Sequence, residues 1–324
     1  MRYLLLLCCL ALLTCDGPGP EGKPSATADV ADVPTATRHA WPDGQPRRVI
    51  LDSDTANEID DLFAIAYLLA EDDPTIDWLG LSSAQWFHVW SGDSTVFQSQ
   101  QLNEDMLRIA GRLDLPHPLG SDLIMGKPWG DYDARDSPAA RFIIEQAHAT
   151  PAGEKLAVLS IGAMTNLASA IALDSTIKEN IVAYTLGFRY DFDEGFWNKD
   201  EFNIRRDLNA ANYLLNADGL ELHVMPISVA IQYAFNMDET FERLEPTGEM
   251  GRYLRRRWET NATDQPKRIM WDVALLQAFL KPEQAPEISV MTPPENTRRG
   301  VWMYTDVDEE AMERDYWGRV GKAR

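Results

Sequence analysis

The sequence predicts a single α/β domain built on an open, mostly parallel, doubly wound (Rossmann-like) sheet. Short apolar runs typical of buried strands alternate with amphipathic segments of helical period, and this alternation continues through residues 46–324. Such a pattern implies parallel strands joined by right-handed crossovers, with helices on both faces of the sheet. A segment of this length is sufficient for one domain with a substantial core.

The expected elements follow the chain in order. Strands are predicted at residues 48–51, 76–81, 156–159, 181–186, 220–226 and 301–305. Helices are predicted at residues 60–70, 102–113, 166–173, 209–215, 271–279 and 309–317. Ligands of open parallel sheets bind beyond the carboxyl ends of the strands. In this chain, the polar residues best suited to ligand binding or catalysis follow the carboxyl ends of the predicted strands.

The N-terminus predicts export. Met1-Arg2 is a short basic start, and residues 3–14 form an apolar run with the length of a signal-peptide core, too short to span a bilayer as a helix. Leu12-Leu13-Thr14-Cys15 resembles the lipobox of bacterial lipoproteins, in which the cysteine is lipidated. We therefore expect a signal peptide at 1–14 and an exported bacterial lipoprotein, anchored to a membrane only through Cys15 on the periplasmic or cell-surface side. Ordinary cleavage without a lipid is the alternative.

Residues 15–45 are expected to form the lipidated cysteine and a flexible tether, because they are rich in Pro, Gly, Ala, Thr and Asp without periodicity. The three cysteines are Cys8, Cys9 and Cys15, so a lipidated mature domain keeps no free thiol. This excludes disulfides, thiolate zinc sites and a cysteine nucleophile. The formal charge of −21 argues against nucleic acid as a partner. The oligomeric state is left open, and a homo-oligomer is possible.

Five carboxylates follow the first predicted strand within ten residues, in the segment Asp52-Ser53-Asp54-Thr55-Ala56-Asn57-Glu58-Ile59-Asp60-Asp61. Without a cation, carboxylates packed this densely would repel one another strongly. Asp52 and Asp54 point to the same side while the chain is extended, and Asp60 and Asp61 open a helix, where negative charge is favoured. Their convergence would make an oxygen-rich site suited to Ca²⁺ or Mg²⁺. A solvated loop that caps a helix is the plainer alternative.

Other interpretations of this segment fail at specific positions. An EF-hand loop beginning at Asp52 requires glycine and glutamate where the chain has Asn57 and Phe63. The phosphatase signature of haloacid dehalogenase-like enzymes requires threonine where the chain has Ala56. The sequence contains no GxxxxGK[ST] phosphate-binding loop. A metal-dependent phosphatase is therefore disfavoured.

Four motifs together resemble the inosine–uridine-preferring nucleoside hydrolases over residues 48–282. Asp52-x-Asp54 followed by Asp60-Asp61 looks like the family's opening signature, in a longer form with two extra residues. The segments 161–167 (IGAMTNL) and 201–204 (EFNI) are similar to its glycine–threonine–asparagine and Glu-Phe-Asn motifs. Trp271-Asp272 at a helix start resembles the late His-Asp segment. The order of the four motifs makes the resemblance specific.

The resemblance implies a role for each matching residue. Asp54 would bind Ca²⁺ and act as general base on a water held by the ion. The other metal ligands would be Asp61, Asp272 and the backbone carbonyl of Ile161. Asp60, Glu201 and Asn203 would hold the ribose hydroxyls, and Asp52 would support the loop from behind. Such a site would hydrolyse the N-glycosidic bond of a ribonucleoside or a close N-riboside, because carboxylates stabilise the oxocarbenium-like charge on the ribose.

The sequence departs from the family pattern in the region expected to face the base. Trp271 stands where some members have a histidine that protonates the leaving base, and His88 is the one histidine expected near a strand's carboxyl end. Asn198 is the candidate for a further polar contact upstream of Glu201. Trp271 could stack on the base, as could the other aromatic residues expected near the pocket: Trp86, Phe87 and Trp197. The alternative function is a non-catalytic lipoprotein that captures nucleosides or sugars.

Overall fold

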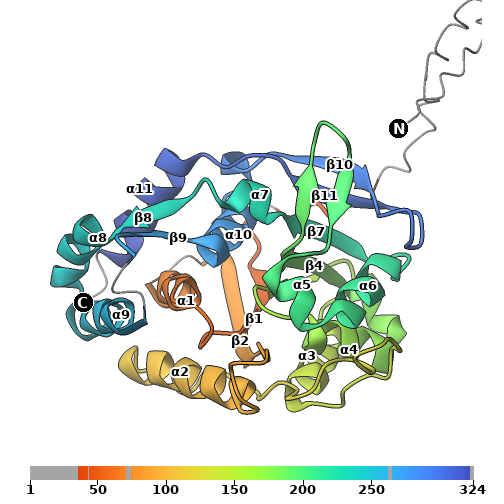
Figure 1. Cartoon of the computed structure of the whole chain (residues 1–324), viewed down its shortest axis with the longest axis horizontal. Coiled ribbons are helices and arrows are strands. Elements are labelled where there is room, and N and C mark those ends of the chain that lie inside the picture. The colour runs from red at the N-terminus through yellow and green to blue at the C-terminus, as the bar shows by residue number, and fades with distance from the viewer. Residues whose placement is uncertain (1–35, 43, 71–73, 262–264, 322–324) are drawn as a thin grey trace, which may run out of the picture. The chain divides into compact units, whose positions relative to one another are not determined.

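A computed structural model describes residues 36–42, 44–70, 74–261 and 265–321 (Figure 1). The predicted signal peptide, Cys15 and the tether up to residue 35 lie outside this part of the chain. In the described part, no helix is both long enough and apolar enough to cross a membrane.

The domain is built around a seven-stranded sheet with the strand order β10-β11-β7-β4-β3-β1-β2. Every neighbouring pair is parallel except β10 with β11, which is antiparallel at one edge. This confirms the predicted open, mostly parallel sheet. The strands are β1 (Arg47–Ser53), β2 (Ile76–Ser83), β3 (Leu156–Ser160), β4 (Ile181–Leu186), β7 (Glu221–Met225), β10 (Glu287–Met291) and β11 (Gly300–Tyr304).

Helices cover both faces of the sheet, as a doubly wound fold requires (Figure 1). One face packs against α1 (Asp60–Ala70), α2 (Thr95–Ile109), α9 (Gly248–Asn261), α10 (Trp271–Leu280) and α11 (Glu309–Val320). The other face packs against α3 (Pro138–His148), α4 (Thr165–Leu173) and α6 (Leu208–Asn216). The central strands β3 and β4 are buried along their whole length, which explains their continuous apolar runs.

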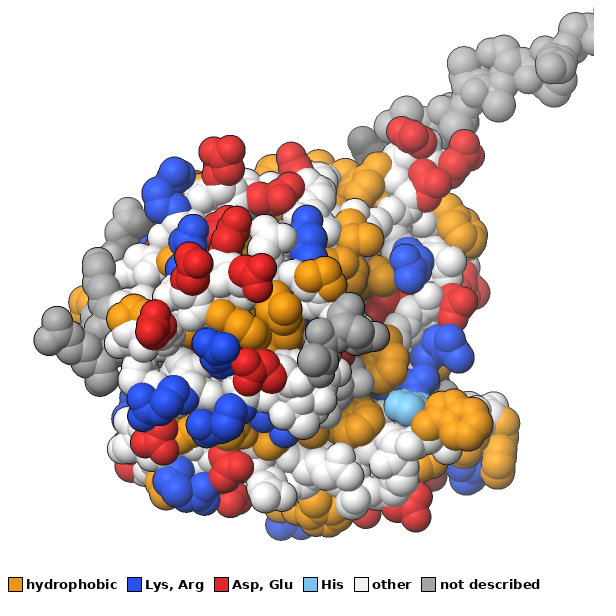
Figure 2. All heavy atoms as spheres, turned by 60° about the vertical axis from the view of Figure 1, so that its left-hand side comes forward, with side chains coloured by type: hydrophobic (Ala, Val, Ile, Leu, Met, Phe, Trp, Pro, Cys, Tyr) orange, Lys and Arg blue, Asp and Glu red, His pale blue; other side chains and the backbone are white. Residues whose placement is uncertain are grey.

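Shorter elements lie around the ends of the sheet. The strands β5 (Arg189–Asp191) and β6 (Phe196–Asn198) form one antiparallel hairpin, and β8 (Ala234–Asn236) pairs with β9 (Lys267–Ile269). The short helices are α5 (Phe202–Arg206), α7 (Ile227–Ala230) and α8 (Met237–Leu244). On the surface, acidic and basic side chains are mixed across the face shown in Figure 2, and hydrophobic side chains gather at its lower right edge.

The structure corrects several expected boundaries. The helix expected at 102–113 spans Thr95–Ile109, because the chain turns at Gly111 with a positive φ. Helix α3 and strand β10 were not predicted. Ser137 caps α3 by accepting a hydrogen bond from the Ala140 amide, and Pro138 occupies the first turn, where proline is tolerated.

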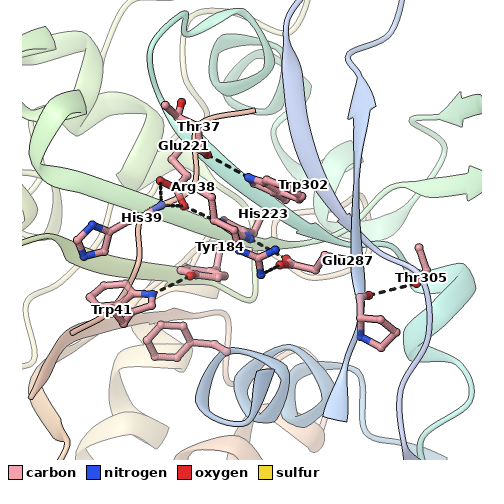
Figure 3. Close-up of polar contacts among 12 residues, drawn as sticks. Thr37, Arg38, His39, Trp41, Tyr184, Glu221, His223, Glu287, Trp302 and Thr305 are labelled. Carbon is pink, nitrogen blue, oxygen red and sulfur yellow. Dashed lines mark hydrogen bonds and ion pairs between the residues drawn. The ribbon is translucent and has the colours of Figure 1, made fainter. Parts of the chain in front are cut away.

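The segment 36–42, expected to belong to the tether, contacts the domain (Figure 3). The His39 amide donates to both carboxylate oxygens of Glu221 at 2.9 and 2.7 Å. Arg38 pairs with Glu287 at 2.6 Å, and the indole of Trp302 donates to the Thr37 carbonyl at 3.0 Å. The described residues from Ala36 to Pro42 therefore already pack on the domain, ahead of the expected domain start at residue 46.

A buried histidine lies beneath this segment, between the same two glutamates (Figure 3). The ring nitrogens of His223 lie 2.6 Å from a Glu287 oxygen and 3.0 Å from a Glu221 oxygen, and its ring stacks on Tyr184. Burial alone would lower the pKa of His223, but hydrogen bonds to the two glutamates and their charges raise it above 6.5. A protonated imidazole that donates to both carboxylates fits this geometry.

The raised pKa of His223 predicts a pH-dependent contribution to stability. The contribution should be complete below pH 6.5 and should be lost as pH rises through the raised pKa of the folded state. The free energy of unfolding, measured by urea titration, should decline above neutral pH in the wild-type protein. The same decline should be absent in His223→Gln. If the free energy of unfolding declined equally above neutral pH in both proteins, the raised pKa of His223 would be contradicted.

Candidate active site

The acidic segment forms the connection between β1 and α1, at the carboxyl end of a central strand. Asp60 and Asp61 lie in the first turn of α1, where the unpaired amides of a helix N-terminus favour negative charge. The hydroxyl of Ser53 donates to Asp61 at 2.5 Å. The four residues from Asp52 to Thr55 are fully or almost fully buried. The solvated-loop alternative is therefore wrong.

Asp52 connects the ends of strands β1 and β2 to helix α4. Its Oδ1 accepts hydrogen bonds from the Ser82 hydroxyl at 2.6 Å and from the Asn166 amide at 2.9 Å. Asn166 also donates to the Ser83 carbonyl at 3.0 Å. Burial raises the pKa of Asp52 to about 6, although these hydrogen bonds lower it. Asp52 does not line the cavity described next.

A cavity of about 170 Å³ lies beyond the carboxyl ends of the strands. Its walls come from the β1–α1 connection, the ends of β3 and β4, helix α5 and the start of α10. The lining residues are Asp54, Asn57, Glu58, Asp60, Asp61, Ile161, Leu186, Arg189, Glu201, Phe202, Asn203, Ile227, Trp271 and Asp272. The fold therefore gathers residues that are more than two hundred positions apart.

Four buried aspartates meet in this cavity. Carboxylate oxygens of Asp60, Asp61 and Asp272 lie within 4.8 Å of one another. The Asp272 amide donates to Asp60 at 3.2 Å, which joins α10 to α1. The fourth, Asp54, has a buried Oδ2 without a hydrogen-bond partner among the described residues. An oxygen that is both buried and unpartnered indicates a missing positive partner.

The electrostatics of the aspartates lead to the same conclusion. Burial raises the pKa of Asp54, and the charges of Asp61 and Asp60 raise it further. Burial also raises the pKa of Asp272, as do the charges of Asp60, Asp61 and Asp54. The four groups cannot all ionise in this space without a cation. An all-oxygen set of this kind suits a hard divalent ion rather than zinc.

The Glu-Phe-Asn segment forms the opposite wall. Glu201 precedes α5, and its carboxylate accepts a hydrogen bond from the Ile204 amide at 3.2 Å. The amide of Asn203 donates to the carbonyls of Ile161 at 2.8 Å and Leu186 at 3.3 Å. These contacts fix Asn203 at the ends of β3 and β4. Ile161 lines the cavity, and its carbonyl oxygen retains a second lone pair for another partner.

The structure separates the aromatic candidates. Trp271 lines the acidic cavity. Trp197 instead belongs to the core, where its indole donates to the Met291 carbonyl at 2.8 Å and its ring meets Phe188. Phe87 and His88 line a neighbouring groove. The expectation that Trp197 faces the pocket is thus wrong, because the β5–β6 hairpin turns its ring inward.

Asn198 also lies away from the cavity lining. Its side-chain oxygen accepts a hydrogen bond from the Asp200 amide at 2.7 Å, which shapes the turn leading into α5. Arg189, which sequence reasoning did not select, lines the cavity near that position. Arg189 lies three residues after the carboxyl end of β4. Its position directly after a buried strand is the feature of the sequence that could have identified it as a site residue.

Comparison with known proteins agrees with this fold. An open, mostly parallel sheet with a buried carboxylate site at its strand ends defines the class of protein. The chain belongs to the inosine-uridine preferring nucleoside hydrolase family, whose model matches residues 49–317. It is therefore a hydrolase that acts on N-glycosyl compounds.

The relatives in this family are distant. The chain is 26% identical over 235 residues to a probable uridine nucleosidase 2 of Arabidopsis thaliana, covering 65% of this chain and 68% of that protein. A plant nucleoside hydrolase has a similar structure, with a TM-score of 0.67 and 19% identity over 86% of this chain and 99% of the other. A purine-preferring ribonucleoside hydrolase from Gardnerella vaginalis gives a TM-score of 0.64 and 18% identity over 86% and 99%. These two structures support the fold.

Gly162 is expected to be essential to the position of Asp54. A Cβ atom at residue 162 would lie 2.7 Å from the Asp54 Oδ1 and 2.8 Å from its Cγ. Gly162→Ala should therefore displace this carboxylate and lower both bound divalent metal and nucleoside turnover. Gly318→Ala is the matched control, because a Cβ there meets nothing within 4 Å. Metal analysis and initial rates that do not change in Gly162→Ala would contradict the close approach.

Proposed function

We propose that this protein is a calcium-dependent hydrolase that cleaves the N-glycosidic bond of ribonucleosides to give ribose and the free base. The observation that carries the proposal is the convergence of four buried aspartates opposite Glu201 and Asn203 in one small cavity. The family supports nucleoside hydrolysis. Calcium and ribose recognition are inferences from the chemistry of the side chains.

The donor set fits calcium. Asp54, Asp61, Asp272 and the Ile161 carbonyl would hold the ion, and Asp60 lies within reach of Asp61 and Asp272. Calcium prefers six to eight oxygen ligands, so a substrate and water can complete such a site. When bound, the ion would lower the pKa of a water molecule and attract the 2′ and 3′ oxygens of the ribose.

The chain's own residues divide the remaining work. Asp54 takes a proton from the attacking water as general base. Asp60, Glu201 and Asn203 hold the ribose hydroxyls, and the nearby negative charge stabilises the oxocarbenium-like transition state. Trp271 contacts the base from the start of α10. No histidine is found among the residues that line the described cavity, so the leaving base receives no proton from an imidazole there.

The non-catalytic binding lipoprotein is the weaker alternative. A protein that only binds a nucleoside needs no buried carboxylate with an oxygen free to accept a proton. Asp54 has such an oxygen, because its Oδ2 is buried and has no hydrogen-bond partner among the described residues. We further propose that the enzyme is an exported lipoprotein attached to a membrane through Cys15, with free nucleosides as its substrates. This part of the proposal is supported by the N-terminal sequence alone.

The first test concerns the metal. The purified protein should contain about one tightly bound Ca²⁺ per chain. Asp272→Ala should lower the calcium content and the melting temperature, because a bound ion stabilises the folded state by linkage. After removal of the ion by a chelator, the two proteins should melt at more similar temperatures. Zinc in place of calcium, or no metal in the untreated protein, would refute the calcium assignment.

The second test concerns the general base. Asp54→Asn should lower kcat for ribonucleosides by about 100-fold or more at saturating Ca²⁺, because an amide cannot accept the proton. Asp114→Asn makes the same chemical change on an exposed side chain and should leave kcat unchanged. The measurement is the release of reducing sugar. Near-normal kcat in Asp54→Asn would exclude this role.

A further inference from the structure

The acidic cavity is too small for a whole nucleoside. Its volume is about 170 Å³, whereas sites for small organic ligands measure roughly 300–1,000 Å³. A second cavity of about 930 Å³ adjoins it at Phe202, which lines both. We call this second cavity the Phe202 groove. A substrate held by its ribose in the acidic cavity therefore has space for its remaining part beyond Phe202.

The walls of the Phe202 groove suit the base of a nucleoside. Phe87 and Trp90 come from the loop after β2, and Trp129 comes from the loop before α3. Trp90 and Trp129 are 88% and 83% exposed, and aromatic rings this exposed beside a cavity indicate a binding surface. A flat heteroaromatic base can stack on such rings. The C5′ end of the ribose carries only a hydroxyl group and needs no cavity of this size, so the groove is the better match for the base.

The loop after β2 is fastened to helix α5, which carries Phe202. The side-chain amide of Gln85 donates to the Arg206 carbonyl at 3.1 Å, and its Oε1 accepts from the Phe87 amide at 2.7 Å. In return, Arg206 Nη1 donates to the Phe87 carbonyl at 2.9 Å. The guanidinium carbon of Arg206 lies 4.5 Å from the centre of the Phe202 ring. These contacts fix the loop against the same helix that holds Asn203 in the acidic cavity.

His88 lies where this loop meets α5. It lines the Phe202 groove, and its ring meets the Phe202 ring edge-on, with 6.2 Å between the ring centroids and 77° between the planes. Glu201 and Asn203, which flank Phe202 in the sequence, line the acidic cavity. Among the residues that line the described groove, His88 is the only histidine. Its imidazole is therefore placed beside the point where a base would pass from the acidic cavity into the groove.

The hydrogen bonds around His88 define which ring nitrogen carries the hydrogen. The Trp90 amide donates to His88 Nδ1 at 3.1 Å. A backbone amide can only donate, so Nδ1 is the acceptor and the hydrogen of the neutral ring is on Nε2. The Ser91 hydroxyl holds the turn by accepting from the His88 amide at 3.0 Å and donating to the His88 carbonyl at 2.9 Å. No acceptor for Nε2 is found among the described residues, so His88 offers a fixed N–H donor without a protein partner.

We infer that His88 is a specificity-determining residue, whose Nε2–H donates a hydrogen bond to a carbonyl oxygen of the base. This inference rests on the proposed function, in which the C1′–N bond of a ribonucleoside is broken. The bases of inosine and uridine, which the family's name contains, both carry carbonyl oxygens. As the bond breaks, its electron pair moves into the base, so the hydrogen bond to the base strengthens in the transition state. The water oxygen bonds to C1′, Asp54 takes a proton from this water, and the base takes its proton from solvent.

A purely structural role for His88 leads to a different expectation. By accepting from the Trp90 amide, His88 could merely close the turn after β2. His88→Asn separates the two roles, because the asparagine oxygen can take the place of Nδ1 as acceptor while no atom takes the place of Nε2. His88→Gln has a longer side chain, whose amide can reach the position of Nε2 and donate there. A structural role therefore predicts normal activity in His88→Asn, and recognition of the base predicts a loss that His88→Gln partly restores.

The experiment compares inosine with 4-nitrophenyl β-D-ribofuranoside at saturating Ca²⁺, with kcat/KM measured by release of reducing sugar. The second substrate has the same ribose, but 4-nitrophenolate leaves readily and needs no hydrogen bond from the protein. His88→Asn should lower kcat/KM for inosine by about 10- to 100-fold, the range for a hydrogen bond to a charged group. The same variant should keep kcat/KM for the nitrophenyl riboside within about twofold. His148→Asn is the matched control, because this histidine is exposed and pairs with Asp174, and it should leave both substrates unchanged.

The outcomes distinguish this inference from the proposed function. If the wild-type protein hydrolyses inosine, the proposed function stands; an unchanged kcat/KM for inosine in His88→Asn, or an equal loss for both substrates, would then overturn the inference. If the wild-type protein hydrolyses neither substrate, the proposed function falls, and calorimetry tests the inference alone. Weaker binding of inosine by His88→Asn, with unchanged binding of ribose, would support it. Equal binding of inosine by the two proteins would overturn it.

Discussion

Mutual repulsion among buried carboxylates is the constraint on which the rest of this structure depends. Asp54, Asp60, Asp61 and Asp272 approach one another where water is largely excluded, and burial raises the pKa of each. The charges of neighbouring carboxylates raise the pKa of each further. Such an arrangement is unfavourable unless a cation compensates it or the groups take up protons. Its retention in the fold is therefore best explained by function. Each converging group offers only oxygen, a donor set that suits a hard divalent ion.

The surrounding structure holds the carboxylates in place against this repulsion. Asp52 links the ends of β1 and β2 to helix α4 through Ser82 and Asn166. Gly162 allows the Asp54 side chain to lie against the backbone that follows β3. Asn203 ties α5 to the ends of β3 and β4. Each contact joins segments distant in sequence, so the site is preorganised by the sheet and not by a single loop.

Other buried charged groups in the fold, unlike the aspartates of the cavity, are satisfied by hydrogen-bond partners from the protein. Arg299 is buried, yet it donates hydrogen bonds to the carbonyls of Leu214, Leu215 and Leu220. His223 lies between two glutamates under the segment that begins at Ala36. In both cases protein partners satisfy the buried charge, as stable structures require. Asp54, which lines the acidic cavity, instead keeps a buried carboxylate oxygen without a hydrogen-bond partner among the described residues.

The sequence by itself determined the fold class, the positions of the main strands along the chain and the acidic motif after β1, because hydrophobic period and local composition are properties of neighbouring residues. It also identified Asp60, Asp61 and Asp272, although their contact was known only through a family resemblance. The tertiary structure alone decided that Trp197 packs into the core, that Asn198 shapes a turn, and that Arg206 donates to the Phe87 carbonyl beside a groove. Those outcomes depend on how the hairpin and loops fold over the sheet edge, and the packing of segments far apart in the chain leaves no periodic signal in the sequence.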